Sequence, residues 1–74
     1  MKRTEIIDSK IVNWVAQLAC FLRQGDIFKK PRGSTHYKFM EFRQEDNLVV
    51  CENLDTHAPE SIYYNSPVYR LWIL

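Results

Sequence analysis

The longest apolar stretch of the chain covers residues 11–22 and holds ten apolar residues in twelve, without glycine, proline or charge. Counted at helical spacing, its large side chains fall on one broad face, and a narrow polar stripe lines up beside them. Gly25 follows the stretch and suits the left-handed residue that ends many helices. The pattern predicts one helix over about 8–24, with these residues on its main face: Ile7, Ile11, Trp14, Val15, Leu18, Phe21 and Leu22.

Beyond Gly25 the pattern changes to short apolar runs separated by turn residues, which is typical of β-strands. Two of these runs are separated by the four polar residues 44–47, a spacing that favours a hairpin. The predicted strands cover about 26–29, 37–43, 48–52, 61–64 and 68–73.

These elements predict an α+β fold in a single small domain, 1–74, with the N-terminal helix packed on a curled antiparallel sheet of four or five strands. Runs that are apolar on both faces favour a covered or strongly curled sheet. A Gly-Asp-Ile-Phe entry at 25–28, a basic turn, two hairpins and a last strand with Trp72 resemble the small SH3-like barrels common in bacteria and their viruses. The resemblance extends over about 25–74, and such a likeness of fold transfers no function.

Composition makes association with a partner the leading expectation. The chain is 46% hydrophobic and 14% aromatic, more apolar surface than a 74-residue domain normally buries. The net charge is +1, which excludes a strong overall field for nucleic acid, but the charge is unevenly spread. Residues 23–43 carry six basic and two acidic side chains, whereas residues 44–66 carry five acidic side chains and no Lys or Arg.

The two cysteines and the N-terminus indicate a compartment. Cys20 and Cys51 both lie in apolar runs, unlike the numerous loop cysteines of small secreted scaffolds. The N-terminal residues do not form a signal peptide, and the predicted helix is too short to span a membrane. We therefore expect a reduced, cytoplasmic setting and no membrane partner.

The basic turn at 29–38 is the strongest local candidate for binding. Lys and Arg side chains neutralise phosphates, and a neighbouring aromatic ring offers a face on which a base can stack. The alternative is a solvated hairpin loop whose charges only keep the surface soluble. The candidate contacts to a partner or to nucleic acid are Lys29, Lys30, Arg32, His36, Tyr37 and Lys38.

The smaller face of the predicted helix is a candidate for self-association. Small side chains at helical spacing allow another backbone to approach closely, so this face would be covered by the rest of the chain or by a second copy across a two-fold axis. The candidate residues for a homodimer are Val12, Ala16, Ala19 and Arg23.

A catalytic or metal site has little support. Cys51, Asp55 and His57 are close in sequence, but a thiol in an apolar strand has no reason to ionise. The residues Cys20, Cys51, His36 and His57 have none of the spacings typical of metal ligands. We expect no enzyme activity and no cofactor.

The sequence favours a non-enzymatic protein-interaction module, of the kind that small phage or mobile-element proteins use to bind and modulate a larger host assembly. The alternative is a nucleic-acid-binding small barrel that uses the basic turn, 29–38.

Overall fold

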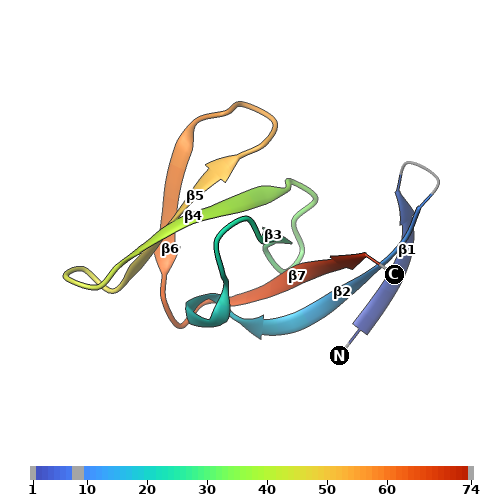
Figure 1. The fold of residues 1–74 in the computed structure, drawn as a ribbon, viewed down its shortest axis with the longest axis horizontal. Helices are drawn as coiled ribbons and strands as arrows, with labels where there is room; N and C mark the ends of the chain where they lie inside the picture. The colour runs from blue at the N-terminus through green and yellow to red at the C-terminus, as the bar shows by residue number, and fades with distance from the viewer. Residues whose placement is uncertain (1, 8–9, 74) are drawn as a thin grey trace.

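A computed structural model describes residues 2–7 and 10–73, and the side-chain surroundings of residues 13–72. The described chain forms one seven-stranded sheet in which every neighbouring pair is antiparallel, in the order β1-β2-β7-β3-β4-β5-β6 (Figure 1). Its elements are β1 (Lys2–Ile7), β2 (Lys10–Leu18), the 3-10 turn η1 (Ala19–Phe21), β3 (Ile27–Lys29), β4 (Tyr37–Arg43), β5 (Leu48–Asn53), β6 (Pro59–Tyr63) and β7 (Pro67–Ile73).

The predicted helix over 8–24 is wrong, and with it the α+β class. Residues 10–18 form strand β2, and the only helical turn among the described residues is the short η1. At Asn13 and Trp14 strand β2 is buried on both faces, because these neighbours point to opposite sides and both are buried, whereas Ala16 and Leu18 further along are exposed. A strand buried on both faces is apolar almost without interruption, so its sequence also satisfies a helical pattern.

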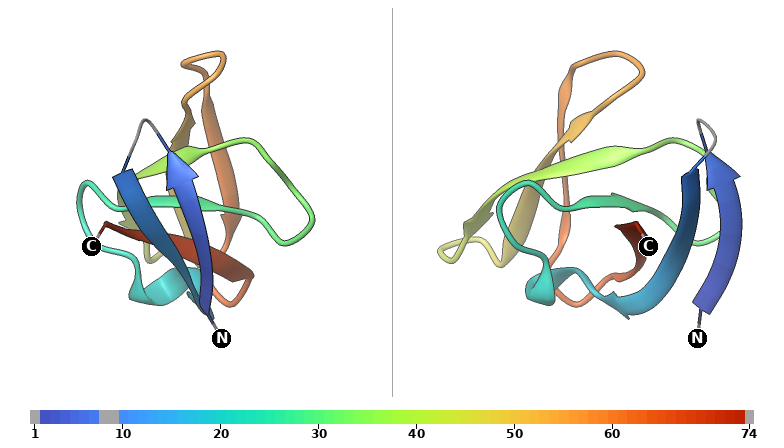
Figure 2. Two further views of the ribbon diagram at one scale, coloured as in Figure 1. Left: turned by 90° about the vertical axis from the view of Figure 1, so that its right-hand side faces the viewer. Right: turned by 45° about the vertical axis from the view of Figure 1, so that its right-hand side comes forward.

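The prediction of four or five strands in the pattern of a small barrel is also wrong. The sheet has two free edges, β1 and β6, and its N-terminal hairpin adds two strands that the sequence pattern did not predict. The last strand of the chain, β7, lies between β2 and β3 and pairs with both. Figure 2 shows how strongly the resulting open sheet curls.

The core lies on the inner side of this curl. Directly opposed residues of neighbouring strands point to the same face, and the pairs Phe28–Tyr37 and Phe39–Cys51 place four of the buried side chains together. A β-bulge between Phe39 and Glu41 increases the twist of β4. Leu22 closes the core beside η1. The complete buried cluster is Ala19, Leu22, Phe28, Tyr37, Phe39, Val49, Cys51 and Val68.

The outer face of the sheet carries a second buried site around Trp14. The Trp14 side chain is fully buried, although it does not belong to the inner cluster. The Lys29 ammonium lies 4.4 Å from the centroid of the indole ring, and the His36 ring packs at 5.2 Å from it. Two side chains from β3 and the segment before β4 therefore cover the tryptophan that a helix was expected to shelter.

Gly25 ends no helix but forms a tight turn. It has a φ of 87°, and the Asp26 N–H donates to the Arg23 carbonyl at 2.9 Å, which is the pattern of a type II turn. In return, an Asp26 carboxylate oxygen accepts from the Arg23 N–H at 2.8 Å. The turn directs the chain from η1 into β3.

Across the described part of the chain, no helix is long and apolar enough to cross a membrane.

We predict that Trp14→Ala lowers the free energy of unfolding by about 3–5 kcal/mol, because it empties a fully buried site. Trp14→Phe should cost much less, about 1.5 kcal/mol or below, because it keeps a ring between Lys29 and His36. It also removes the indole N–H, a buried donor without an acceptor among the described residues. Urea unfolding followed by circular dichroism measures both variants, and equal losses would contradict this account.

Candidate functional site

The predicted basic turn is not a single exposed patch. Lys29 and His36 cover Trp14, and Tyr37 is buried in the inner core, where its ring stacks on Phe28. Arg32, with a φ of 65°, and Lys38 are the exposed members of the set.

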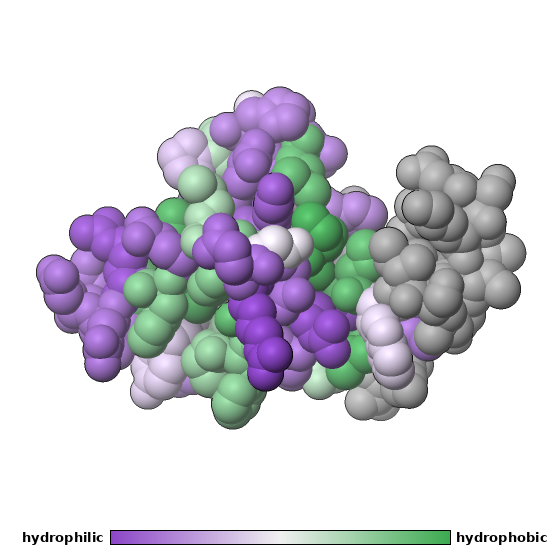
Figure 3. All heavy atoms as spheres, in the orientation of Figure 1, coloured by the Kyte–Doolittle hydropathy of each residue, from purple (hydrophilic) through white to green (hydrophobic). Residues whose placement is uncertain are grey.

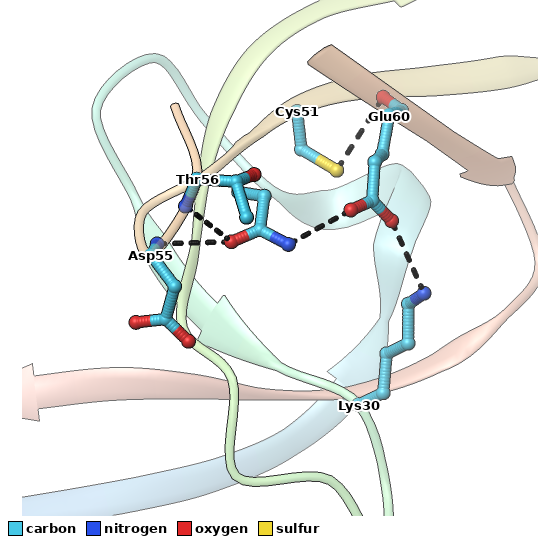
Figure 4. Close-up of polar contacts among 6 residues, drawn as sticks. Lys30, Cys51, Asp55, Thr56 and Glu60 are labelled. Atoms are coloured by element: carbon cyan, nitrogen blue, oxygen red, sulfur yellow. Dashed lines mark hydrogen bonds and ion pairs between the residues drawn. The ribbon is translucent and has the colours of Figure 1, made fainter. Parts of the chain in front are cut away.

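Lys30 belongs to a polar network that joins the basic and acidic halves of the sequence (Figure 4). Its ammonium lies 4.9 Å from the Tyr37 ring centroid and 3.8 Å from a carboxylate oxygen of Glu60. The other Glu60 oxygen accepts a hydrogen bond from the Asn53 amide at 2.9 Å. Because the carboxylate receives a cation and an amide donor together, the network fixes the segment after β3 against β5 and β6.

Asn53 also organises the loop between β5 and β6. Its side-chain oxygen accepts from the backbone N–H groups of Asp55 at 2.9 Å and Thr56 at 3.2 Å, which defines an Asx-type turn (Figure 4). His57 takes the left-handed conformation, with a φ of 61°, and its N–H donates to the Asn53 carbonyl at 2.6 Å. One side chain thus holds both the loop and Glu60.

Among the residues predicted for self-association, Ala16, Ala19 and Arg23 do not lie on one face of a single element. Ala16 is exposed on β2, Ala19 is fully buried in the inner core, and Arg23 lies in the turn before β3. Val12 lies on β2, and its side chain is outside the described part. Since the helix that would have aligned these residues is absent, the structural basis of the predicted face is lost.

Cys51, Asp55 and His57 do not converge. Cys51 is fully buried, and its thiol lies 3.6 Å from the Glu60 carbonyl oxygen. Burial, with the nearby Glu60 carboxylate as a second cause and Lys30 opposing, raises the pKa of the Cys51 thiol to about 11. His57 is exposed, and its Nδ1 lies 2.8 Å from a carboxylate oxygen of Glu52. The histidine is therefore held by another residue and does not face the thiol.

No cluster of three or more His, Cys, Asp or Glu side chains that could hold a metal ion occurs within the described residues.

A polar cleft lies between β2, β7 and the turn at Gly25, and we call it the arginine cleft. Its volume is about 410 Å³. Arg70 Nε donates to the Gln17 side-chain oxygen at 2.9 Å, which fixes the guanidinium of Arg70 on the inner side of the sheet. The residues that line the cleft are Gln17, Phe21, Arg23, Asp26 and Arg70.

Positive charge exceeds negative charge in the arginine cleft. Neither Arg23 nor Arg70 has an ion pair within the described part of the chain, and Asp26 is the only acidic residue of the lining. The Gln17 amide nitrogen is buried and has no acceptor among the described residues. The cleft therefore offers hydrogen-bond donors and a net positive charge, a combination suited to an anion.

Sequence reasoning missed this cleft because its residues are distant along the chain: Gln17 and Arg70 are separated by 53 positions. One signal was present. Gln17 and Arg70 are both polar residues in otherwise apolar strands, and polar groups that are buried in such strands require hydrogen-bond partners.

Comparison with models of protein families, with curated proteins and with solved structures found no match for this chain.

We predict that Asn53→Asp lowers the free energy of unfolding at pH 7 by about 1–3 kcal/mol. The aspartate keeps an oxygen for the turn but replaces the amide donor with a carboxylate that faces Glu60. The loss should shrink at pH 4, where one of the two carboxyls can take a proton and donate. Urea unfolding of the variant and the wild type at pH 7 and at pH 4 measures this loss of free energy. Asn65→Asp, the same change in an exposed turn, is the control, and a loss independent of pH would contradict the mechanism.

We predict that the two thiols differ sharply in reactivity. With a pKa of about 11, only about one in a thousand Cys51 thiols is ionised at pH 8, whereas Cys20 is exposed. A disulfide reagent should modify one thiol rapidly in the folded protein, and Cys20→Ser should abolish this phase. Because the folded pKa exceeds the unfolded value of 9.0, the contribution of Cys51 to stability is full below pH 9 and declines between pH 9 and 11. Rapid labelling of Cys51 in the folded Cys20→Ser variant would contradict the assignment.

Proposed function

We propose that this chain is a non-enzymatic protein-interaction module. The observation that supports the proposal is the amount of large apolar surface that remains outside the folded core. Contiguous apolar surface on a small domain is typical of protein interfaces, and aromatic residues and methionine are enriched there. The large apolar side chains that are at least 41% exposed are Leu18, Phe21, Met40, Phe42, Tyr63, Tyr64 and Trp72.

The contact surface we propose is the apolar rim, which we define as Phe42 and Tyr64. Phe42 lies opposite the buried Val49, so the inner face of β4 continues beyond the core into solvent. Tyr64 borders the same end of the sheet, since its backbone N–H donates to the Asn47 carbonyl at 2.9 Å and its carbonyl accepts from Cys20 at 2.8 Å. Figure 3 shows apolar atoms over this part of β4 and around η1.

Charges beside the apolar rim favour a partner with basic side chains. The end of the β4–β5 hairpin, residues 41–46, carries Glu41, Glu45 and Asp46 against one basic residue, Arg43, which pairs with Asp46 at 3.6 Å. A surface with an apolar centre and an acidic edge complements a partner with an apolar centre and a basic edge. We therefore propose a different protein, part of a larger assembly, rather than a second copy, whose hairpin would bring the same acidic charge.

Nucleic-acid binding through the basic turn is the second candidate. Of its six residues, Lys29, Lys30 and His36 already contact other groups of the fold, and Tyr37 is buried. Only Arg32 and Lys38 of these six residues are left for phosphate contacts, which is fewer than the sequence predicted. The apolar rim is therefore the better supported surface.

We further propose that the protein works in the reducing cytoplasm. The support is that both cysteines are free thiols and that Cys20 is exposed, because an exposed thiol persists in a reducing compartment.

We predict that Phe42→Ser combined with Tyr64→Ser weakens retention of the partner from an extract of the native host by at least about tenfold. Tyr63→Ser is the matched control, since Tyr63 is the adjacent tyrosine, is 68% exposed and points to the other side of β6. Glu45→Lys should also weaken retention if the partner has a basic edge. Quantitative mass spectrometry of the bound fraction measures these effects, and circular dichroism verifies folding.

Two results would contradict this proposal. One is a bound protein whose retention is unchanged in the rim variant or falls equally in Tyr63→Ser. The other is a wild-type chain that sediments as a dimer and becomes a monomer in the rim variant, which would make a second copy the occupant of the rim.

A further inference from the structure

We propose that the arginine cleft binds a nucleotide, with its phosphate between Arg23 and Arg70 and its base on the ring of Phe21. The ligand is a free nucleotide or one unit of a single strand, since both present the same phosphate and base. This inference uses other residues than the apolar rim and does not depend on the proposed protein partner.

The phosphate contact rests on how Arg70 is held. Its Nε donates to Gln17, so both terminal nitrogens of the guanidinium are left without an acceptor among the described residues. That bond also fixes the Gln17 amide, because the reverse orientation would set two donors against each other. A guanidinium fixed through Nε offers a planar pair of donors, the geometry that suits a phosphate.

The charge of the cleft matches one phosphate. The lining holds two arginines and one aspartate, a net charge of +1. The Asp26 carboxylate is partly satisfied by the backbone N–H of Arg23, which leaves the Arg23 guanidinium available. A singly charged phosphodiester or phosphate monoanion balances this charge, and arginine remains charged at every physiological pH.

The size of the cleft and the aromatic ring at its edge indicate a ligand larger than phosphate alone. A volume of about 410 Å³ exceeds the need of an isolated oxyanion and lies in the ~300–1,000 Å³ range of small-molecule sites. Phe21 lines the cleft and is 68% exposed, so one face of its ring is open to a base. Trp72 lies two residues beyond Arg70 on the same side of β7 and is 46% exposed, which places a second ring where the next base of a strand would pass.

Fluorescence anisotropy of labelled single strands of about eight nucleotides, DNA and RNA, tests the inference at low salt. Arg23→Gln should weaken binding at least about tenfold. Gln17→Glu should do the same, because it still accepts from Arg70 but adds a negative charge. Arg43→Gln and Arg32→Gln remove the same charge elsewhere and should change the affinity less than about twofold. Phe21→Leu should weaken the binding of nucleotides but not of inorganic phosphate, measured by calorimetry.

The arms of the experiment separate the two sources of the nucleotide. A strand should compete far better than the mononucleotide if the ligand is a polymer, with a salt slope of about −0.7 for the one phosphate that the cleft neutralises. Equal affinity of mononucleotide and strand identifies a free nucleotide. Absence of binding for every probe overturns the inference, as does equal loss in Arg43→Gln, Arg32→Gln and Arg23→Gln. Stronger competition by a glutamate-rich peptide than by phosphate also overturns it.

Discussion

Pairing of β7 with both β2 and β3 is the constraint on which the rest of the structure depends. Among the described strands, β7 is the only one that joins the N-terminal hairpin to the strands of the core. Its partners on β2 are about fifty residues away in sequence, so the pairing closes a long loop. The chain loses conformational entropy in this closure before any contact between the strands compensates the loss. The arginine cleft follows from the same pairing, because β7 brings Arg70 to Gln17 and no local contact could do so.

The position of β7 between β2 and β3 also explains how the sheet buries side chains on both faces. The chain has 74 residues and, in its described part, no long helix that covers either face. The curl gathers Phe28, Val49 and Val68 on the inner side, where opposed strands supply neighbours. On the outer side, the Lys29 ammonium and the His36 ring pack against the buried Trp14. Long amphipathic side chains can cover apolar surface in this way while their polar ends stay near water. The arrangement commits part of the basic turn to the fold and reduces what it can offer to a ligand.

The sequence predicted the strands after Gly25 far better than the segment before it, and the reason is physical. The later runs alternate with turn residues, and β4 covers 37–43 as expected, with a hairpin to β5. Residues 11–22 are nearly all apolar, so a period of 3.6 and a period of 2 fit them equally well. The polar residues Asn13 and Gln17 do not distinguish a helix from a strand, because residues four apart lie on the same face in both. β-branched residues and tryptophan, which favour strands, were the better signal in this segment. The candidate site residues are dispersed for a related reason: the sequence gives the order of the charged residues, whereas strand register decides which of them come into contact.

The uneven charge of the sequence illustrates that last point and indicates where binding should occur. The basic segment 23–43 and the acidic segment 44–66 are neutralised in part against each other through the ion pair of Lys30 with Glu60, whose other carboxylate oxygen accepts from the Asn53 amide. His57 meets Glu52, and Arg43 meets Asp46, so several charges that stand out in sequence are used within the fold. Arg23 and Arg70 form no ion pair within the described part of the chain, although Arg70 donates a hydrogen bond to Gln17. Arg23 is exposed and Arg70 is half-buried, so both guanidinium groups are open to the anion proposed above. Figure 3 shows hydrophilic atoms over the segment between η1 and β3 beside the apolar atoms of β4, so the two proposed surfaces share one face of the molecule.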